Sequence, residues 1–149
     1  FIKKDGEIAK RKVLSFLFKG KTKSELEKLG KSFAVEVIPS ILLPAAMEEI
    51  EAHKKRRDRV VVISASLENW LKPWAESMKL ELICTEMEYK DGKFTGRFAT
   101  ANCNGQEKVN RINSYLDMKQ YKPVFAYGNS SGDKPMLEMA DHGFYRHFE

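Results

Sequence analysis

Apolar residues recur at helical spacing through residues 1–57, and no strand pattern interrupts them. The segment Ile8–Phe18 predicts a helix with a broad buried face that stops at Gly20. Thr22 and Glu25 have the spacing of a capping box, which predicts the start of a second helix. Pro44 predicts the start of a third helix that runs into a basic cluster. We therefore expect residues 1–57 to form a region of short helices.

The pattern changes after residue 58, where strand-like and helical segments alternate. Val60–Ile63 is a continuous β-branched run, which is typical of a strand buried on both faces in a parallel sheet. Leu80–Thr85 and the apolar run that ends at Gly128 predict further strands. Asp91-Gly92 lies between alternating residues and predicts a β-hairpin. This order predicts an α/β fold with a doubly wound parallel sheet over residues 58–149.

Composition narrows the class of protein. The chain has 149 residues, 42% of them hydrophobic, which suits one proper core. Its net charge of +5 comes from Lys and Arg residues that are spread along the chain. The densest basic cluster, His53 to Arg59, is interpreted as a solvated helix end, where positive charges complement the helix dipole. We therefore expect no nucleic-acid partner. Apolar runs fall short of the ~20 residues of a membrane span, and we expect a cytoplasmic protein. Cys84 and Cys103 lack disulfide or metal spacing and are expected to be partly buried.

The loop after Gly128 holds the first candidate for chemistry. Asn129 and Asp133 lie four residues apart and follow a strand, in the kind of crevice where open α/β sheets bind ligands. Their side-chain oxygens suit a hard cation such as Mg2+. Asp133 also precedes Lys134-Pro135, so it is equally a candidate N-cap for the next helix. The loop alone leaves the two interpretations even.

Two further segments are expected at the same edge of the sheet. Ser64 ends the first buried strand, and its hydroxyl with the backbone N–H groups of Ala65 and Ser66 can hold phosphate oxygens. Lys108 lies in the first turn of a predicted helix and can neutralise a phosphoryl group. Alternatively, Ser64 or Ser66 only caps the next helix, and Lys108 is an ordinary surface lysine. Loops at one edge of a parallel sheet meet in space, which favours a shared site.

The order of these motifs resembles the haloacid dehalogenase superfamily of phosphatases, and more closely its phosphoserine-phosphatase-like branch. Val60–Ser64 is similar to the second motif of that family, Asn102–Val109 to the third, and Tyr127–Leu137 to the fourth. The helices of residues 1–57 look like the small cap that this branch inserts after its first strand. The resemblance implies a Rossmann-like core over residues 58–149 with a helical cap over residues 1–57.

The resemblance also implies roles for the candidate residues. Ser64 would hold a phosphate oxygen, Lys108 would offset the charge on the phosphate, and Asp133 with Asn129 would orient Mg2+. The implied activity is hydrolysis of a small phosphate monoester through an aspartyl-phosphate. Neither the substrate nor the oligomeric state follows from the residues.

Two departures from the family pattern stand out. The first motif, a strand ending Asp-x-Asp-Gly-Thr that supplies the nucleophile, is not found, and the nearest string, Phe1–Glu7, places Lys3 where the nucleophile belongs. We expect the nucleophile upstream of this sequence, and a gap where the central strand would lie. Asn129 replaces the usual aspartate, which weakens the expected metal site. The alternatives are a catalytically inactive domain that binds a phosphorylated ligand or partner and, more weakly, a nucleic-acid-binding protein.

Overall fold

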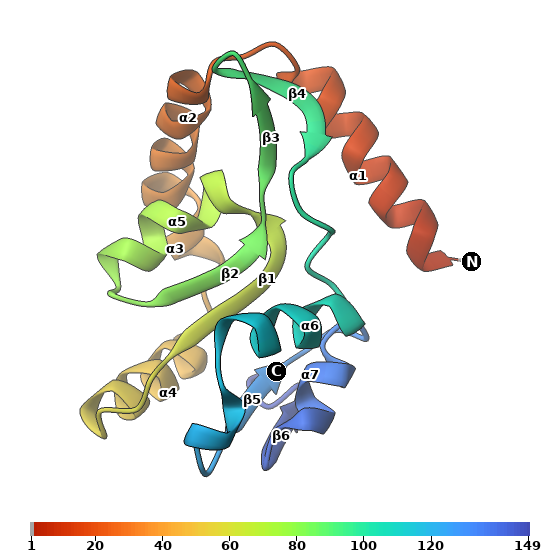
Figure 1. Ribbon diagram of the computed structural model, residues 1–149. Coiled ribbons are helices and arrows are strands. Elements are labelled where there is room, and N and C mark those ends of the chain that lie inside the picture. Colours follow the sequence, from red (N-terminus) through yellow and green to blue (C-terminus); the bar gives the residue numbers. More distant parts are fainter. Residues whose placement is uncertain (1) are drawn as a thin grey trace.

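The computed structural model describes residues 2–149; helices make up its first part, and strands and helices are interspersed from residue 61 onward (Figure 1). The helices are α1 (Ile2–Phe18), α2 (Lys23–Glu36), α3 (Ile38–Ile41), α4 (Pro44–Lys55), α5 (Glu68–Ser77), α6 (Gln106–Tyr115) and α7 (Lys134–Met139), with the 3-10 turn η1 (Met118–Gln120). The strands are β1 (Val61–Leu67), β2 (Glu81–Thr85), β3 (Met87–Lys90), β4 (Lys93–Phe98), β5 (Phe125–Gly128) and β6 (His142–Tyr145). No helix within residues 2–149 combines the length and apolar character needed to cross a membrane.

The parallel strands form two separate pairs. Strand β1 pairs with β2, and β5 pairs with β6, both in parallel register. No ladder of hydrogen bonds joins β1 to β5 within residues 2–149. The α/β fold with parallel strands is therefore confirmed, and the expected gap between its two halves is present. The core of this part is an apolar cluster formed by Ile83, Cys103, Ile112, Met136 and Leu137.

The β3–β4 hairpin stands between α1 and α2 rather than in the parallel sheet (Figure 1). The turn residues Asp91 and Gly92 have φ values of 51° and 74°, as a two-residue hairpin turn with two positive φ angles requires. Phe94 and Leu26 are fully buried between the hairpin and α2, and Trp70 of α5 packs on the same cluster. The hairpin thus supplies the second apolar core of the molecule.

The helix starts and ends follow the local signals of the sequence. The Thr22 hydroxyl accepts a hydrogen bond from the backbone N–H of Glu25 at 3.2 Å, and the Glu25 carboxylate accepts one from the Thr22 N–H at 2.8 Å. The predicted capping box of α2 is therefore confirmed. Helix α1 begins at Ile2, earlier than the predicted Ile8.

Helix α4 packs against the second pair of strands. The His53 ring lies 5.4 Å from the ring of Phe125 and 5.8 Å from that of Tyr127, and His53 is buried. Its Nδ1 lies 2.8 Å from the Asp58 carboxylate. The interpretation of the basic cluster as a solvated helix end is therefore wrong for His53, which instead fixes α4 to β5. The division of the chain after residue 57 remains a prediction.

Candidate active site

Lys108 is the residue on which the candidate site converges. It lies in the first turn of α6, and its side chain is only 7% exposed. Its Nζ donates a hydrogen bond to the backbone oxygen of Ile63 at 2.8 Å and lies 2.8 Å from Oδ1 of Asp133. The alternative that Lys108 is a surface lysine is therefore wrong. The structure brings the ends of β1 and β5 together with the start of α6, as the topology of a parallel sheet favours.

The second oxygen of Asp133 is held by its own loop. Oδ2 accepts hydrogen bonds from the Ser130 N–H at 2.8 Å, the Ser130 hydroxyl at 2.7 Å and the Asn129 N–H at 3.2 Å. Burial opposes ionisation, but the hydrogen bonds from Lys108 and Ser130 outweigh it and lower the pKa of Asp133 below its ordinary value. Asp133 stands at the N-cap position of α7, yet its side chain makes no capping bond. The alternative that the Asp133 side chain caps α7 is therefore wrong.

Two glycines allow the loop to close on Asp133. A Cβ atom at Gly128 would lie 2.5 Å from Cβ of Asp133, and one at Gly132 would lie 1.8 Å from Oδ1 of Asn104. The Gly105 N–H donates to the Gly132 oxygen at 2.9 Å, which ties this loop to the segment before α6. Any side chain at either glycine would push the loop away from Lys108, so the close approach explains both residues.

Ser64, Ala65 and Ser66 form an irregular end of β1. Strand β1 continues to Leu67 beyond the predicted end at Ser64, and its register with β2 shifts between Ser64 and Leu67. The Ser64 hydroxyl accepts a hydrogen bond from the Ser66 N–H at 3.0 Å. Helix α5 has Leu67 at its N-cap and no side-chain cap, so the interpretation of Ser64 or Ser66 as a helix cap is wrong. The Ser64 hydroxyl retains its proton for donation to a ligand.

Lys10 of α1 is a part of the site that the sequence did not indicate. Its Nζ donates hydrogen bonds to the backbone oxygen of Ala65 and to Oδ1 of Asn102, the latter at 2.8 Å. Burial and the neighbouring Arg11 lower the pKa of Lys10, although Glu7 opposes this shift. Two ammonium groups, those of Lys10 and Lys108, therefore bind carbonyl groups of β1 beside the serines. Such a concentration of positive charge suits an anion.

The oxygen donors of the 128–133 loop fit magnesium in type. Mg2+ is commonly held by one or two carboxylates together with phosphate oxygens and water. Asp133 supplies one carboxylate, already bonded to Lys108, and Asn129 supplies an exposed amide. Within the described chain, no group of three or more His, Cys, Asp or Glu side chains gathers around a common point. The loop therefore suits a metal that takes its remaining ligands from elsewhere.

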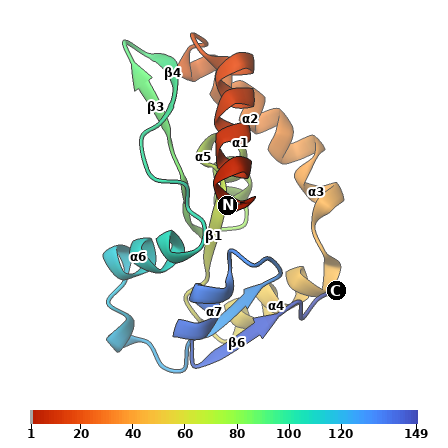
Figure 2. The same cartoon turned by 90° about the vertical axis from the view of Figure 1, so that its right-hand side faces the viewer.

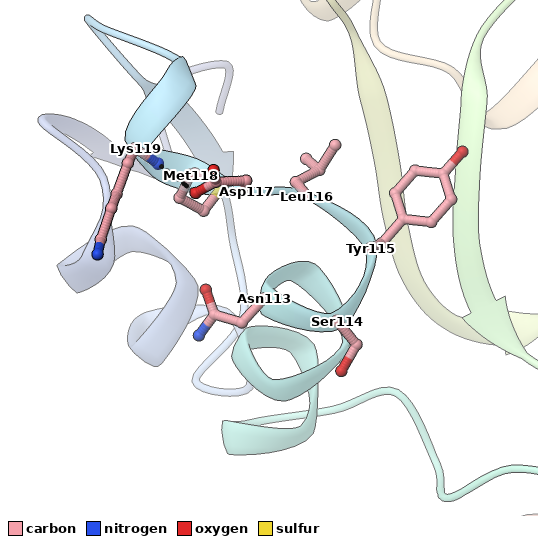
Figure 3. A pocket seen from close by; sticks show the side chains of 7 residues that line it. All are labelled: Asn113, Ser114, Tyr115, Leu116, Asp117, Met118 and Lys119. Carbon is pink, nitrogen blue, oxygen red and sulfur yellow. Dashed lines mark hydrogen bonds between the residues drawn. The ribbon is translucent and has the colours of Figure 1, made fainter.

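Two hollows in the described part of the chain differ in their relation to this site, and one of them adjoins it. The larger, about 450 Å3, is formed by consecutive residues 113–119 around the turn after α6 and includes none of the candidate residues (Figure 3). The second, about 320 Å3, lies between α1, the end of β1 and the start of α5, and we call it the α1–β1 pocket. Ser66 and Lys10 both line it, so it opens beside the candidate anion site.

Fold and site together define an α/β protein with a charged site at the ends of its parallel strands. The model of the haloacid dehalogenase-like hydrolases matches residues 2–138, and the chain belongs to this family. It is 30% identical over 150 residues to protein CicA of Caulobacter vibrioides, covering 99% of this chain and 67% of that protein. It is 33% identical over 110 residues to a probable phosphatase of Mycobacterium tuberculosis, covering 72% of this chain and 38% of that protein.

Solved structures share the fold. A protein of unknown function from Bordetella pertussis superposes with a TM-score of 0.72 at 26% identity, over 80% of this chain and 56% of that one. A phosphoserine phosphatase holding an analogue of its phospho-aspartyl intermediate superposes with a TM-score of 0.63 at 22% identity, over 91% of this chain and 61% of that one. The chain thus has the fold of the phosphoserine-phosphatase-like branch and spans little more than half the length of these structures.

Proposed function

We propose that the protein is a magnesium-dependent phosphatase that hydrolyses a small phosphate monoester through an aspartyl-phosphate intermediate. The buried Lys108–Asp133 pair at the end of β1 carries this proposal. Burying a charged lysine costs much free energy unless an anion lies beside it, and Asp133 is the anion beside Lys108. A phosphate held at the Ser64 end of β1 would provide the second negative partner.

The chain's own residues would bind and neutralise the phosphoryl group. The Ser64 hydroxyl would donate to one phosphate oxygen, supported by the N–H group of Ala65. The N–H group of Ser66, predicted to bind phosphate as well, donates instead to the Ser64 hydroxyl and would hold that hydroxyl in place. Lys108 would offset the negative charge that the nucleophile and the phosphate bring together. Asp133, with Asn129, would hold Mg2+, which when bound draws charge from the phosphate oxygens.

The nucleophile of this proposal is an aspartate outside residues 1–149. Its carboxylate would attack phosphorus as the bond to the substrate oxygen breaks, and the second aspartate of the same missing motif would protonate the leaving oxygen. That aspartate would then accept a proton from the water that cleaves the aspartyl-phosphate to release inorganic phosphate. The similarity to a probable phosphatase supports the reaction class. Asn129, where the family pattern has an aspartate, favours the second candidate function, a domain that binds a phosphorylated ligand or partner without turnover.

Phosphate release by the full-length protein tests the proposal. We expect release from at least one member of a panel of phosphate monoesters in Mg2+, and none in excess EDTA. Lys108→Ala and Asp133→Ala should each remove most turnover while the circular dichroism spectrum is retained. Near-normal rates in both variants would contradict the site assignment. Binding of a phosphate ester without release by the wild type would favour the inactive-domain alternative.

A further inference from the structure

The α1–β1 pocket combines an apolar wall with a polar end. Its wall is formed by Ala9, Val13, Leu14, Leu67 and Trp70. Within the described part of the chain, its remaining lining residues are Lys10 and Ser66. Helix α1 supplies one side of the pocket, and the end of β1 with the start of α5 supplies the other. Figure 2 shows how α1 runs past α5 and β1. The pocket is therefore an apolar space that begins at the residues assigned to phosphate binding.

The polar end is fixed in place by hydrogen bonds. Lys10 binds the oxygen of Ala65 and the side chain of Asn102, so its ammonium group stays beside the strand end. Ser66 is held by its N–H, which donates to the Ser64 hydroxyl at 3.0 Å. A phosphate at Ser64 would lie at this end, and the group esterified to it would extend toward the apolar wall.

Helix α1 carries further exposed apolar side chains on the turn that follows the pocket wall. Val13 belongs to the pocket wall and is 55% exposed, and Phe16 and Leu17 on the next turn are 89% and 52% exposed. A polar alcohol such as serine would find little to bind here, because the lining offers no carboxylate for an ammonium group. A hydrocarbon chain would instead cover apolar side chains along its length.

We propose, on the basis of the proposed function, that this pocket binds the alcohol part of the substrate and that this part is a hydrocarbon chain. The substrate class is then a phosphate monoester of an alkyl or acyl-bearing alcohol. The continuity between the anion site and the apolar wall carries the proposal. Val13, Leu14 and Trp70 are the residues that would discriminate by chain length.

Binding of non-hydrolysable alkylphosphonates tests this directly. We would titrate the full-length protein, in Mg2+ buffer, with ethyl-, butyl-, hexyl- and octylphosphonate by isothermal calorimetry. The dissociation constant should fall roughly threefold to fourfold for each methylene that is buried. Val13→Asp should abolish the dependence on chain length, because it places a carboxylate in the apolar wall. Val35→Asp is the matched control, because Val35 is 76% exposed on α2 and lies outside the pocket lining.

Each outcome decides the proposal. A chain-length series that binds equally, or no binding of any phosphonate, would overturn it. Dependence that survives Val13→Asp, or disappears equally in Val35→Asp, would place the chain elsewhere and would also overturn it. The two proposals can fail separately, because this experiment measures binding. Failure to release phosphate would refute the proposed function but not the assignment of the pocket. Equal dissociation constants for all the phosphonates would refute the assignment of the pocket but not the proposed hydrolysis.

Discussion

The buried ion pair between Lys108 and Asp133 allows a quantitative test of how the site is held together. Their side chains are 7% and 10% exposed, and the charged atoms lie 2.8 Å apart. Removing one partner of a buried pair typically costs about 3–5 kcal/mol, because the other charge is left buried. We would measure Lys108→Met, Asp133→Asn and the double variant in a double-mutant cycle, using urea unfolding followed by tryptophan fluorescence.

The structure predicts that the two single variants differ. In Lys108→Met the Asp133 carboxylate keeps three hydrogen bonds from Ser130 and Asn129, so its cost should lie near 3 kcal/mol, the lower end of about 3–5 kcal/mol. In Asp133→Asn the ammonium group of Lys108 loses its negative partner, and the new amide NH2 faces either that ammonium group or the donors of Ser130 and Asn129, so the cost should lie near the upper end of about 3–5 kcal/mol. The double variant should cost less than the sum, by about 1–3 kcal/mol.

An exposed pair provides the control for this cycle. Arg97 and Glu88 of the hairpin lie 3.0 Å apart, but the Arg97 side chain is 75% exposed. A cycle on this pair should give a coupling of only about 0–1 kcal/mol. Coupling at Lys108–Asp133 no larger than at Arg97–Glu88, or a larger loss in Lys108→Met than in Asp133→Asn, would refute the reasoning.

Three further changes have defined outcomes. Gly128→Ala should cost about 1–3 kcal/mol in urea unfolding, because its Cβ would lie 2.5 Å from that of Asp133. Gly6→Ala in α1, where no described atom lies within 4 Å of the added Cβ, should instead stabilise the protein by about 0.5–1 kcal/mol. Burial raises the pKa of Cys84 to about 12, so its thiol should resist Ellman's reagent at pH 8 until the protein is unfolded, and rapid native labelling would contradict its burial. Asn129→Asp should lower the Mg2+ concentration that gives half-maximal phosphate release, because it adds a carboxylate ligand, and Asn129→Ala should not.

Local signals in the sequence predicted the local structure well. The Asp91-Gly92 turn and the capping box of Thr22 depend on residues close in sequence, and both form as expected. The alternation of strands and helices also gave the fold class, because buried parallel strands require continuous apolar runs. The meeting of Lys108 with Asp133 followed from topology, since both lie at the same edge of the strands.

Contacts between elements that are distant in sequence could not be predicted from such local signals. Lys10 looks like any lysine on the polar face of a helix, and only the docking of α1 beside β1 brings it to Ala65. His53 lies in a basic run that suggested solvent exposure, yet the rings of Phe125 and Tyr127 bury it. In both cases the sequence fixes the chemistry of the side chain, and tertiary packing fixes its partner.

The most direct test of the central claim is to trap the covalent intermediate. The full-length protein would be mixed, in the presence of Mg2+, with a phosphate monoester that it hydrolyses. The reaction would be quenched in acid within one turnover and analysed by intact and peptide mass spectrometry. We predict a phosphoryl adduct on an aspartate. This adduct should be absent in EDTA and strongly reduced in Lys108→Ala. Turnover without any adduct, or an adduct that forms equally in Lys108→Ala, would contradict a site built around Lys108 and Asp133.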